Sequence, residues 1–100
     1  IDIIKSGGYK LSALEIEATL LEHPDIREVA VIGVPDDEWG EIVAAAVVLA
    51  NAVSEGSLIQ WSRERISGYK VPRQWVFTDS LPRNALGKVT KPSLSAWFEG

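Results

Sequence analysis

The hydrophobic and polar positions of this chain predict three main strands in its middle and last third. The expected strands cover residues 28–34, 42–50 and 74–78. The first two are nearly unbroken runs of β-branched and small apolar residues, which is typical of strands covered on both faces. The short connection between them favours antiparallel pairing. The third strand alternates, so Trp75 and Phe77 are expected on one face and Val76 on the other.

A helix is predicted to begin after Ser12. Ser12 and Glu15 have the spacing of a capping box, and the apolar positions that follow repeat with a helical period. The apolar face expected to be buried consists of Leu14, Ala18 and Leu21, with Ile16 and Leu20 beside it. Pro24 marks the end of this helix, since the residue before a proline avoids the α region.

Two further helices are expected in the second half of the chain. Ser57 and Gln60 form another capping box, which predicts a helix through Ile66. Residues 69–72 are expected to be extended, and Pro92 is placed for the first turn of a last short helix.

The N-terminal segment predicts a small hairpin. Two short extended segments flank the pair Gly7-Gly8, and paired glycines permit positive φ and close approach of a neighbouring backbone or ligand. The whole pattern predicts an α+β fold in one domain of residues 1–100: a small three-stranded sheet covered by helices, with an N-terminal two-stranded hairpin.

Composition narrows the function classes. The chain has no cysteine and one histidine, which excludes disulfides, thiolate metal sites and multi-histidine metal sites. No apolar run approaches the roughly 20 residues that span a bilayer. The sequence starts without methionine or a signal-peptide pattern, so it is expected to be a piece of a longer protein.

The net charge of −4 hides an uneven distribution of charged residues. Residues 12–60 hold ten acidic side chains and one basic side chain, whereas residues 61–100 hold seven basic and three acidic ones. A cationic end on an acidic domain favours a small anionic ligand over a polynucleotide. Solvated surface charge without any ligand is the alternative interpretation.

The sequence gives little support for a catalytic site formed by its own residues alone. His23 lies beside Pro24 without a nucleophile elbow, so a cap or surface histidine is the better interpretation. Glu15 and Glu17 are two positions apart on a helix and do not share a face. The acidic residues within 36–41 lack the pattern of a calcium loop and predict a solvated turn. No metal site is therefore expected.

Two glycine-containing loops, each with a lysine nearby, remain as candidates at opposite ends of the chain. The informative segments are 2–10 (Asp-Ile-Ile-Lys-Ser-Gly-Gly-Tyr-Lys), 14–17 (Leu-Glu-Ile-Glu), 31–36 (Val-Ile-Gly-Val-Pro-Asp), 40–41 (Gly-Glu), 69–72 (Tyr-Lys-Val-Pro) and 81–89 (Leu-Pro-Arg-Asn-Ala-Leu-Gly-Lys-Val). In this order they resemble the C-terminal domain of adenylate-forming enzymes: acyl-CoA synthetases, peptide-synthetase adenylation domains and luciferases. The run 7–17 is most similar to malonyl-CoA synthetases.

The resemblance implies an AMP-forming acid–thiol ligase that works in two steps. Such enzymes join a carboxylate to ATP, release pyrophosphate, and then transfer the acyl group to a thiol. ATP and Mg²⁺ would be bound mainly by a large N-terminal domain outside this sequence, with coenzyme A as the acyl acceptor. The chain is then expected to be the mobile C-terminal domain, inactive alone. Its partners would be its own N-terminal domain, ATP, CoA and a small carboxylic acid such as malonate.

The resemblance also implies roles for individual residues. Lys88 matches the position of the catalytic lysine, Gly87 would let the backbone turn, and Pro82 would stiffen the approach. The residues expected to bind substrate or CoA are Gly7, Gly8 and Tyr9, which would line the pantetheine channel, and Lys70, Arg73 and Arg83, which would contact CoA phosphates. The hinge would fall at Ile1 and Asp2, where Ile1 replaces the family's usual Asp or Lys.

Two alternatives remain open. One is an adenylation domain that loads a carrier-protein thiol instead of CoA. The other is a non-catalytic binding module with a decayed site, against which the intact loop around Lys88 argues. Neither nucleic acid nor membrane is expected as a partner, and a cytoplasmic location is expected.

Overall fold

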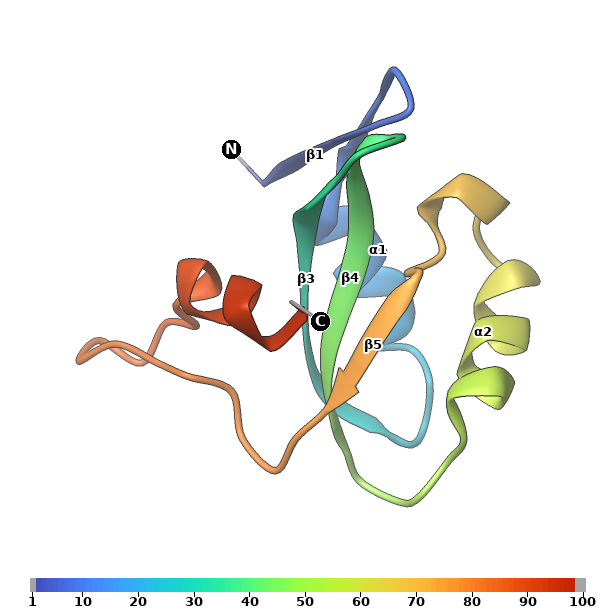
Figure 1. The fold of residues 1–100 in the computed structure, drawn as a ribbon. Helices are drawn as coiled ribbons and strands as arrows, with labels where there is room; N and C mark the ends of the chain where they lie inside the picture. The colour runs from blue at the N-terminus through green and yellow to red at the C-terminus, as the bar shows by residue number, and fades with distance from the viewer. Residues whose placement is uncertain (1, 99–100) are drawn as a thin grey trace.

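The computed structural model describes residues 2–98, and its strands, two pairs and a single one, are each followed by helices along the chain (Figure 1). The elements are β1 (Ile3–Ser6), β2 (Tyr9–Ser12), α1 (Ala13–Leu20), β3 (Ile26–Asp36), β4 (Gly40–Leu49), α2 (Glu55–Arg63), the 3-10 helix η1 (Gly68–Lys70), β5 (Gln74–Phe77) and the 3-10 helix η2 (Lys91–Phe98). This order confirms the predicted α+β fold.

Strand β4 lies at the centre of a five-stranded sheet. It pairs antiparallel with β3 from Ile26↔Leu49 to Asp36↔Gly40, as the short connection predicted. β5 lies on the other side of β4 and runs parallel to it, because the chain crosses over through α2 before it returns. The hairpin of β1 and β2 joins the same sheet through the pair Ser6↔Gly40, so it is continuous with the sheet rather than merely attached to it.

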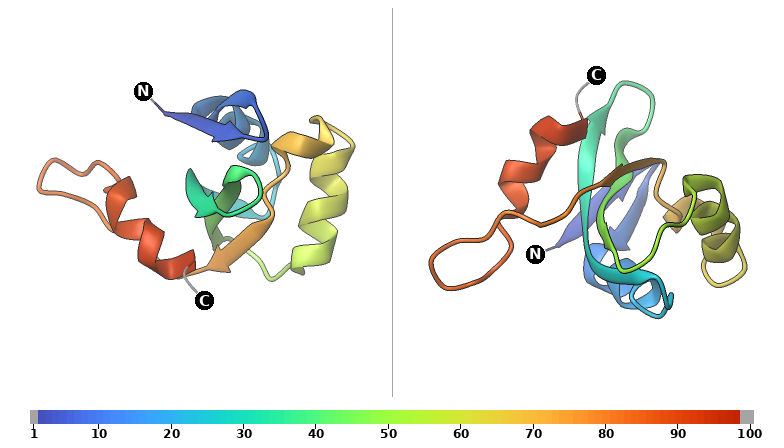
Figure 2. Two further views of the ribbon diagram at one scale, coloured as in Figure 1. Left: turned by 45° about the horizontal axis from the view of Figure 1, so that its top comes forward. Right: turned by 90° about the horizontal axis from the view of Figure 1, so that it is seen from below.

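Both faces of the sheet are covered, as the unbroken apolar strands predicted. On one face, α1 and α2 pack through Ile16, Leu20 and Leu58 against side chains of β3, β4 and β5. On the other face, Leu94 of η2 packs with Leu81 against the alternate side chains of β3 and β4. Figure 2 shows η2 and α2 on opposite sides of the sheet. The loop that precedes η2 is therefore attached to the face opposite both α-helices.

Helix α1 begins as predicted, and the predicted buried face is right for Ile16 and Leu20 but wrong for Leu14, Ala18 and Leu21. The Ser12 hydroxyl accepts a hydrogen bond from the Glu15 N–H (3.2 Å), which is the expected cap. The buried side chains are Ala13, Ile16 and Leu20, while the predicted stripe of Leu14, Ala18 and Leu21 is exposed. Both stripes satisfy helical spacing. The hydrogen bond from the Ala13 N–H to the Asp2 carbonyl (2.8 Å) ties the first turn of the helix to the hairpin and favours the stripe that contains Ala13.

Helix α2 begins one turn earlier than predicted. Its cap is Ser54, whose hydroxyl accepts the Ser57 N–H (3.1 Å), so the predicted capping role of Ser57 is wrong. The helix ends at Arg63 rather than Ile66. Ser54 competes successfully because Glu55 then lies in the first turn, where a negative charge is favourable.

The segment after α2 also differs from the prediction. Residues 68–70 form the 3-10 turn η1 instead of an extended exit, and Val71 behind it is extended and buried. The last helix lies where Pro92 predicted it, as a 3-10 helix that starts at Lys91. Within residues 2–98, no helix is long and apolar enough to cross a membrane.

Candidate functional site

Residues 81–88, the lysine loop, project from the body of the domain as a narrow hairpin-like turn (Figure 1). The Asn84 side chain organises the turn, because its Oδ1 accepts the backbone N–H groups of Leu86 (2.9 Å) and Lys88 (3.1 Å). The Asn84 carbonyl accepts the N–H of Gly87 (3.0 Å), and its N–H donates to the Lys88 carbonyl (2.9 Å). Gly87 has φ +86°, a conformation that side-chain-bearing residues rarely adopt, which agrees with its predicted turning role.

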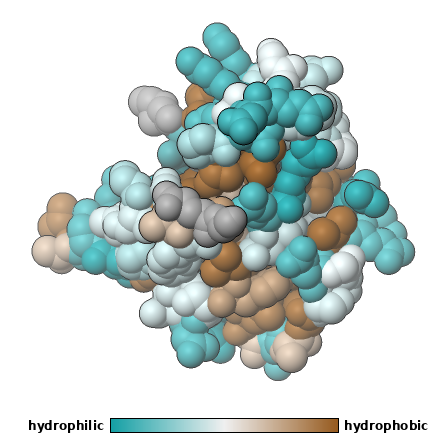
Figure 3. All heavy atoms as spheres, in the orientation of Figure 1, coloured by the Kyte–Doolittle hydropathy of each residue, from teal (hydrophilic) through white to brown (hydrophobic). Residues whose placement is uncertain are grey.

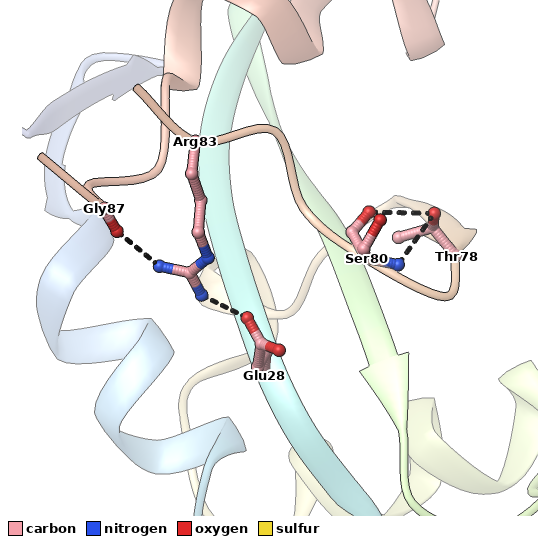
Figure 4. Close-up of polar contacts among 5 residues, drawn as sticks. All are labelled: Glu28, Thr78, Ser80, Arg83 and Gly87. Carbon is pink, nitrogen blue, oxygen red and sulfur yellow. Dashed lines mark hydrogen bonds and ion pairs between the residues drawn. The ribbon is translucent and has the colours of Figure 1, made fainter. Parts of the chain in front are cut away.

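The base of the lysine loop is held on the sheet. Leu81, the first residue of the loop, is buried. Thr90 donates its N–H to the Pro82 carbonyl (2.9 Å), which joins the segment that leaves the loop to the segment that enters it. Arg83 and Val89 form an isolated β-bridge one step further out. Before the loop, Thr78 and Ser80 form a short bend, in which the Thr78 hydroxyl donates to the Ser80 carbonyl (3.0 Å; Figure 4).

Arg83 braces the lysine loop from within. Its Nη1 donates to the Gly87 carbonyl (2.8 Å), and its Nη2 pairs with the Glu28 carboxylate on β3 (Figure 4). The guanidinium thus links the far side of the turn to the sheet. The predicted contact between Arg83 and CoA phosphates stays a prediction, since the group is engaged here in an internal contact. Sequence reasoning missed Glu28, because nothing local marks its pairing with a residue 55 positions away.

Lys88 is the exposed charge at the end of this braced turn. Its backbone N–H and its carbonyl both form hydrogen bonds with Asn84, while its side chain is exposed. No carboxylate among residues 2–98 forms an ion pair with it. Figure 3 shows apolar atoms at the tip of the projecting loop, where Leu86 is 88% exposed. The loop therefore combines a fixed backbone with an exposed cationic side chain.

The turn between β1 and β2, formed by Gly7 and Gly8 and called here the glycine turn, has two unequal glycines. Both have positive φ, +56° and +88°. A Cβ on Gly7 would lie 2.6 Å from Cε3 of Trp39, and the Gly7 N–H donates to the Trp39 carbonyl (2.9 Å). A Cβ on Gly8 would meet nothing within 4 Å. Gly7 is thus required by internal packing, whereas Gly8 leaves open space beside the backbone.

A pocket of about 250 Å³ lies beside the glycine turn. It is lined by Ser6, Tyr9, Trp39, Gly68, Tyr69 and Arg73. The rings of Tyr9 and Tyr69 stack with centroids 4.4 Å apart, and the Arg73 guanidinium lies 5.2 Å from the Trp39 ring centroid. Lys70 follows on the same turn and forms a loose contact with Glu15 (3.5 Å).

The pocket draws together three separate segments of the chain. The predicted site residues Tyr9 and Arg73 meet in it, while Trp39 and Tyr69 were not predicted as site residues. The available signal was weak: two aromatic residues in connecting segments, each next to a motif glycine or lysine. Figure 1 shows the hairpin that ends in the glycine turn well separated from the lysine loop, so the predicted site residues fall into two separate groups.

The remaining predicted positions have simpler surroundings. Of the predicted hinge, Ile1 lies outside the described residues, and Asp2 is fastened by its carbonyl to Ala13 (2.8 Å) and by its carboxylate to Lys91 (3.1 Å). His23 is buried rather than at the surface, and its Nδ1 accepts the Asp25 N–H (3.0 Å). Among residues 2–98, no three side chains of the metal-ligating types are grouped so as to hold a metal ion.

Comparison with known proteins gives consistent matches over nearly the whole chain. The chain is 51% identical over 96 residues to the mitochondrial malonate–CoA ligase ACSF3 of Mus musculus, covering 94% of this chain and 16% of that protein. It is 42% identical over 110 residues to the malonate–CoA ligase of Arabidopsis thaliana, covering 98% of this chain and 18% of that protein. It therefore spans less than a fifth of the length of these relatives.

Solved structures share the fold. A fatty acyl CoA synthetase of Mycobacterium tuberculosis superposes with a TM-score of 0.89 at 42% identity, over 97% of this chain and 20% of that one. The o-succinylbenzoate CoA synthetase of Bacillus subtilis, in complex with its acyl-adenylate intermediate, superposes with a TM-score of 0.88 at 40% identity, over 93% of this chain and 19% of that one. The profile of the AMP-binding enzyme C-terminal domain matches residues 15–88, from the capping glutamate of α1 to Lys88. The chain belongs to the AMP-binding enzyme C-terminal domain family.

Proposed function

We propose that this chain is the mobile C-terminal domain of an AMP-forming acyl-CoA synthetase, and that it acts with a large N-terminal domain outside this sequence. The full-length protein forms an acyl-adenylate from ATP and a small acid such as malonate, and then an acyl-CoA thioester. The observation that carries the proposal is the lysine loop: a turn fixed by Asn84 and Arg83 that leaves the Lys88 side chain exposed and without an ion-pair partner among residues 2–98. The family profile supports it by extending through Lys88.

Lys88 supplies positive charge during adenylate formation. In this step a carboxylate attacks the α-phosphate of ATP, so two anions approach each other while pyrophosphate leaves. An ammonium group held between them offsets their repulsion most strongly where negative charge accumulates. The fixed backbone of the lysine loop allows this placement without further ordering at the moment of reaction, and the absence of a carboxylate partner among residues 2–98 leaves the charge available.

The glycine turn serves the second step, in which a thiol replaces AMP on the acyl group. Gly8 has open space where a side chain would lie, so the narrow pantetheine arm of CoA can pass close to the backbone. Tyr9 and Arg73 line the adjoining pocket, and Lys70 directly follows Tyr69 of its lining, so Arg73 and Lys70 are the cations proposed to contact the phosphates of CoA. Because the lysine loop and the glycine turn are apart, the domain turns between the two steps.

ATP and Mg²⁺ belong mainly to the large domain in this proposal. When bound there, Mg²⁺ would supply positive charge that neutralises the phosphates of ATP. Residues 2–98 contribute no cluster of ligands for it, so this domain adds the lysine and the thiol channel.

The substrate is tested by giving the full-length enzyme ATP, Mg²⁺, malonate and CoA, with acetate and succinate as competing acids. We expect malonyl-CoA, AMP and pyrophosphate as products, and no turnover by residues 1–100 alone. Formation of ADP and phosphate, or turnover by the isolated chain, would contradict the proposal. Transfer to a carrier-protein thiol in preference to CoA would identify the alternative acceptor.

The cytoplasmic location stays a prediction. The name of the mouse relative places that enzyme in mitochondria, so fractionation of cells that express the full-length protein would decide between the two compartments.

A further inference from the structure

Lys91 is the meeting point of three elements at the root of the lysine loop. It lies three residues after Lys88 and is the first residue of η2. Its Nζ contacts Oε2 of Glu17 on α1 (2.8 Å) and Oδ2 of Asp2 (3.1 Å), which directly precedes β1. One ammonium group therefore connects the C-terminal stem of the loop to the start of the chain and to the first helix.

These contacts are sheltered and their polar groups are well satisfied. The side chains of Lys91 and Glu17 are 21% and 15% exposed, less than in any other ion pair among residues 2–98. The same Glu17 oxygen also accepts the Val31 N–H (2.8 Å) on the outer edge of β3. Ion pairs with limited solvent access keep more of their strength than exposed ones. Without Lys91, the Glu17 and Asp2 carboxylates would face each other with no cation between them.

The cluster also fixes the segment next to the predicted hinge. The Asp2 carbonyl accepts the Ala13 N–H (2.8 Å), so both its backbone and its side chain are tied to the domain. On the loop side, the Thr90 N–H bonds to the Pro82 carbonyl (2.9 Å) immediately before Lys91. A short, continuous set of contacts thus connects the loop that carries Lys88 to the start of the domain.

We propose that Lys91 is a positioning residue for adenylate formation. It holds the root of the lysine loop against Asp2 and Glu17, so that Lys88 keeps a fixed position relative to the segment about which the domain turns. This inference rests on the proposed function. A displacement of about 1 Å can cost about a hundredfold in rate, and only the first half-reaction depends on Lys88. The glycine turn lies at the opposite end of the β1–β2 hairpin from this cluster, and its own contact there is the Gly7 N–H bond to the Trp39 carbonyl (2.9 Å).

The test uses the full-length enzyme with Lys91→Met, which keeps the length of the side chain and removes its charge. We expect the kcat of ATP–pyrophosphate exchange to fall about ten- to hundredfold, with little change in the KM for ATP. Transfer of the acyl group from supplied acyl-adenylate to CoA should change by less than about threefold on the same grounds. Lys91→Arg should restore most of the exchange, and Arg27→Met, which removes an exposed cation on β3, is the matched control.

Each contrary outcome points to a different conclusion. Unchanged exchange in Lys91→Met, or an equal loss in both half-reactions, would overturn the positioning role and leave Lys91 as a fold-stabilising residue. If Lys91→Met does not fold, Asp2→Asn provides the same test from a more exposed side chain and should lower exchange selectively. Lys88→Ala in parallel separates the two ideas: if it leaves exchange intact, the proposed function fails, whereas loss in Lys88→Ala without loss in Lys91→Met rejects only the role of Lys91.

Discussion

The lysine loop and the glycine turn achieve their exposure in opposite ways. The lysine loop has many internal contacts, from Asn84, Arg83 and the closed stems, and all of them fix the backbone that carries one free side chain. In the glycine turn, Gly7 is fixed against Trp39, and its neighbour Gly8 has no side chain and open space beside it. The lysine loop exposes a positive charge, and the glycine turn leaves open space beside its backbone. This difference is what two successive steps, on an anion and then on a thiol arm, require.

Removal of the charge from the lysine loop should have the largest effect. In the full-length enzyme, Lys88→Ala should raise the barrier of adenylate formation by about 3–4 kcal/mol, because one preorganised group that stabilises developing charge is lost. The measurement is ATP–pyrophosphate exchange, with Arg27→Ala as a control for loss of an exposed cation. Exchange within a few-fold of the wild type would remove Lys88 from the reaction.

Filling the space beside Gly8 should produce the next largest effect, on the other half-reaction. Gly8→Leu places its Cβ where nothing lies within 4 Å, so it should fold but obstruct the thiol arm. We expect transfer to CoA to fall by about a hundredfold, the cost typical of a reactant misplaced by about 1 Å, while ATP–pyrophosphate exchange persists. Gly8→Ala imposes the same strain at positive φ with a much smaller side chain and is the matched control. Normal CoA turnover by Gly8→Leu would remove this turn from the channel.

The two adjacent glycines should respond differently in stability. Gly7→Ala must displace Trp39 in addition to adopting positive φ, so it should lower the free energy of unfolding by about 1–3 kcal/mol more than Gly8→Ala. Urea unfolding of residues 1–100, followed by tryptophan fluorescence, measures both variants. Equal losses would show that the contact with Trp39 is easily relieved and that the glycines are not specialised.

The brace of the lysine loop should give the smallest effect. The Arg83 and Glu28 side chains are 44% and 33% exposed, so their pairing should contribute about 0.5–1 kcal/mol. Arg83→Met and Glu28→Gln should each slow pyrophosphate exchange a few-fold, and the double variant should be no slower than Arg83→Met alone. If Arg83 instead contacts CoA, Arg83→Met alone would raise the KM for CoA while Glu28→Gln would not.

The features predicted correctly from the sequence are those that local physics determines. The cap at Ser12, the strands around Val31 and Ala45, and the positive φ of the Gly7-Gly8 pair each follow from neighbouring residues. Local patterns could not choose between two helical stripes on α1, because both satisfy the same spacing. For α2 the local pattern favoured the wrong cap, because Ser57 has Gln60 three residues later whereas Ser54 has a serine there.

The parts of the sites that were not predicted depend on contacts between distant segments. Arg83 meets Glu28 across the sheet, and Tyr9 meets Tyr69 only because the hairpin and η1 approach each other after folding. The sequence motifs marked the two loops proposed to be functional, but neither the contact between Arg83 and Glu28 nor the aromatic residues that line the pocket have a local signature.

The most direct test of the division between the two loops is single-turnover transfer from preformed malonyl-adenylate to CoA by full-length Lys88→Ala. The lysine serves only the first step in this account, so the variant should transfer within a few-fold of the wild-type rate although its pyrophosphate exchange is lost. A transfer rate that falls as far as the exchange rate would contradict the account.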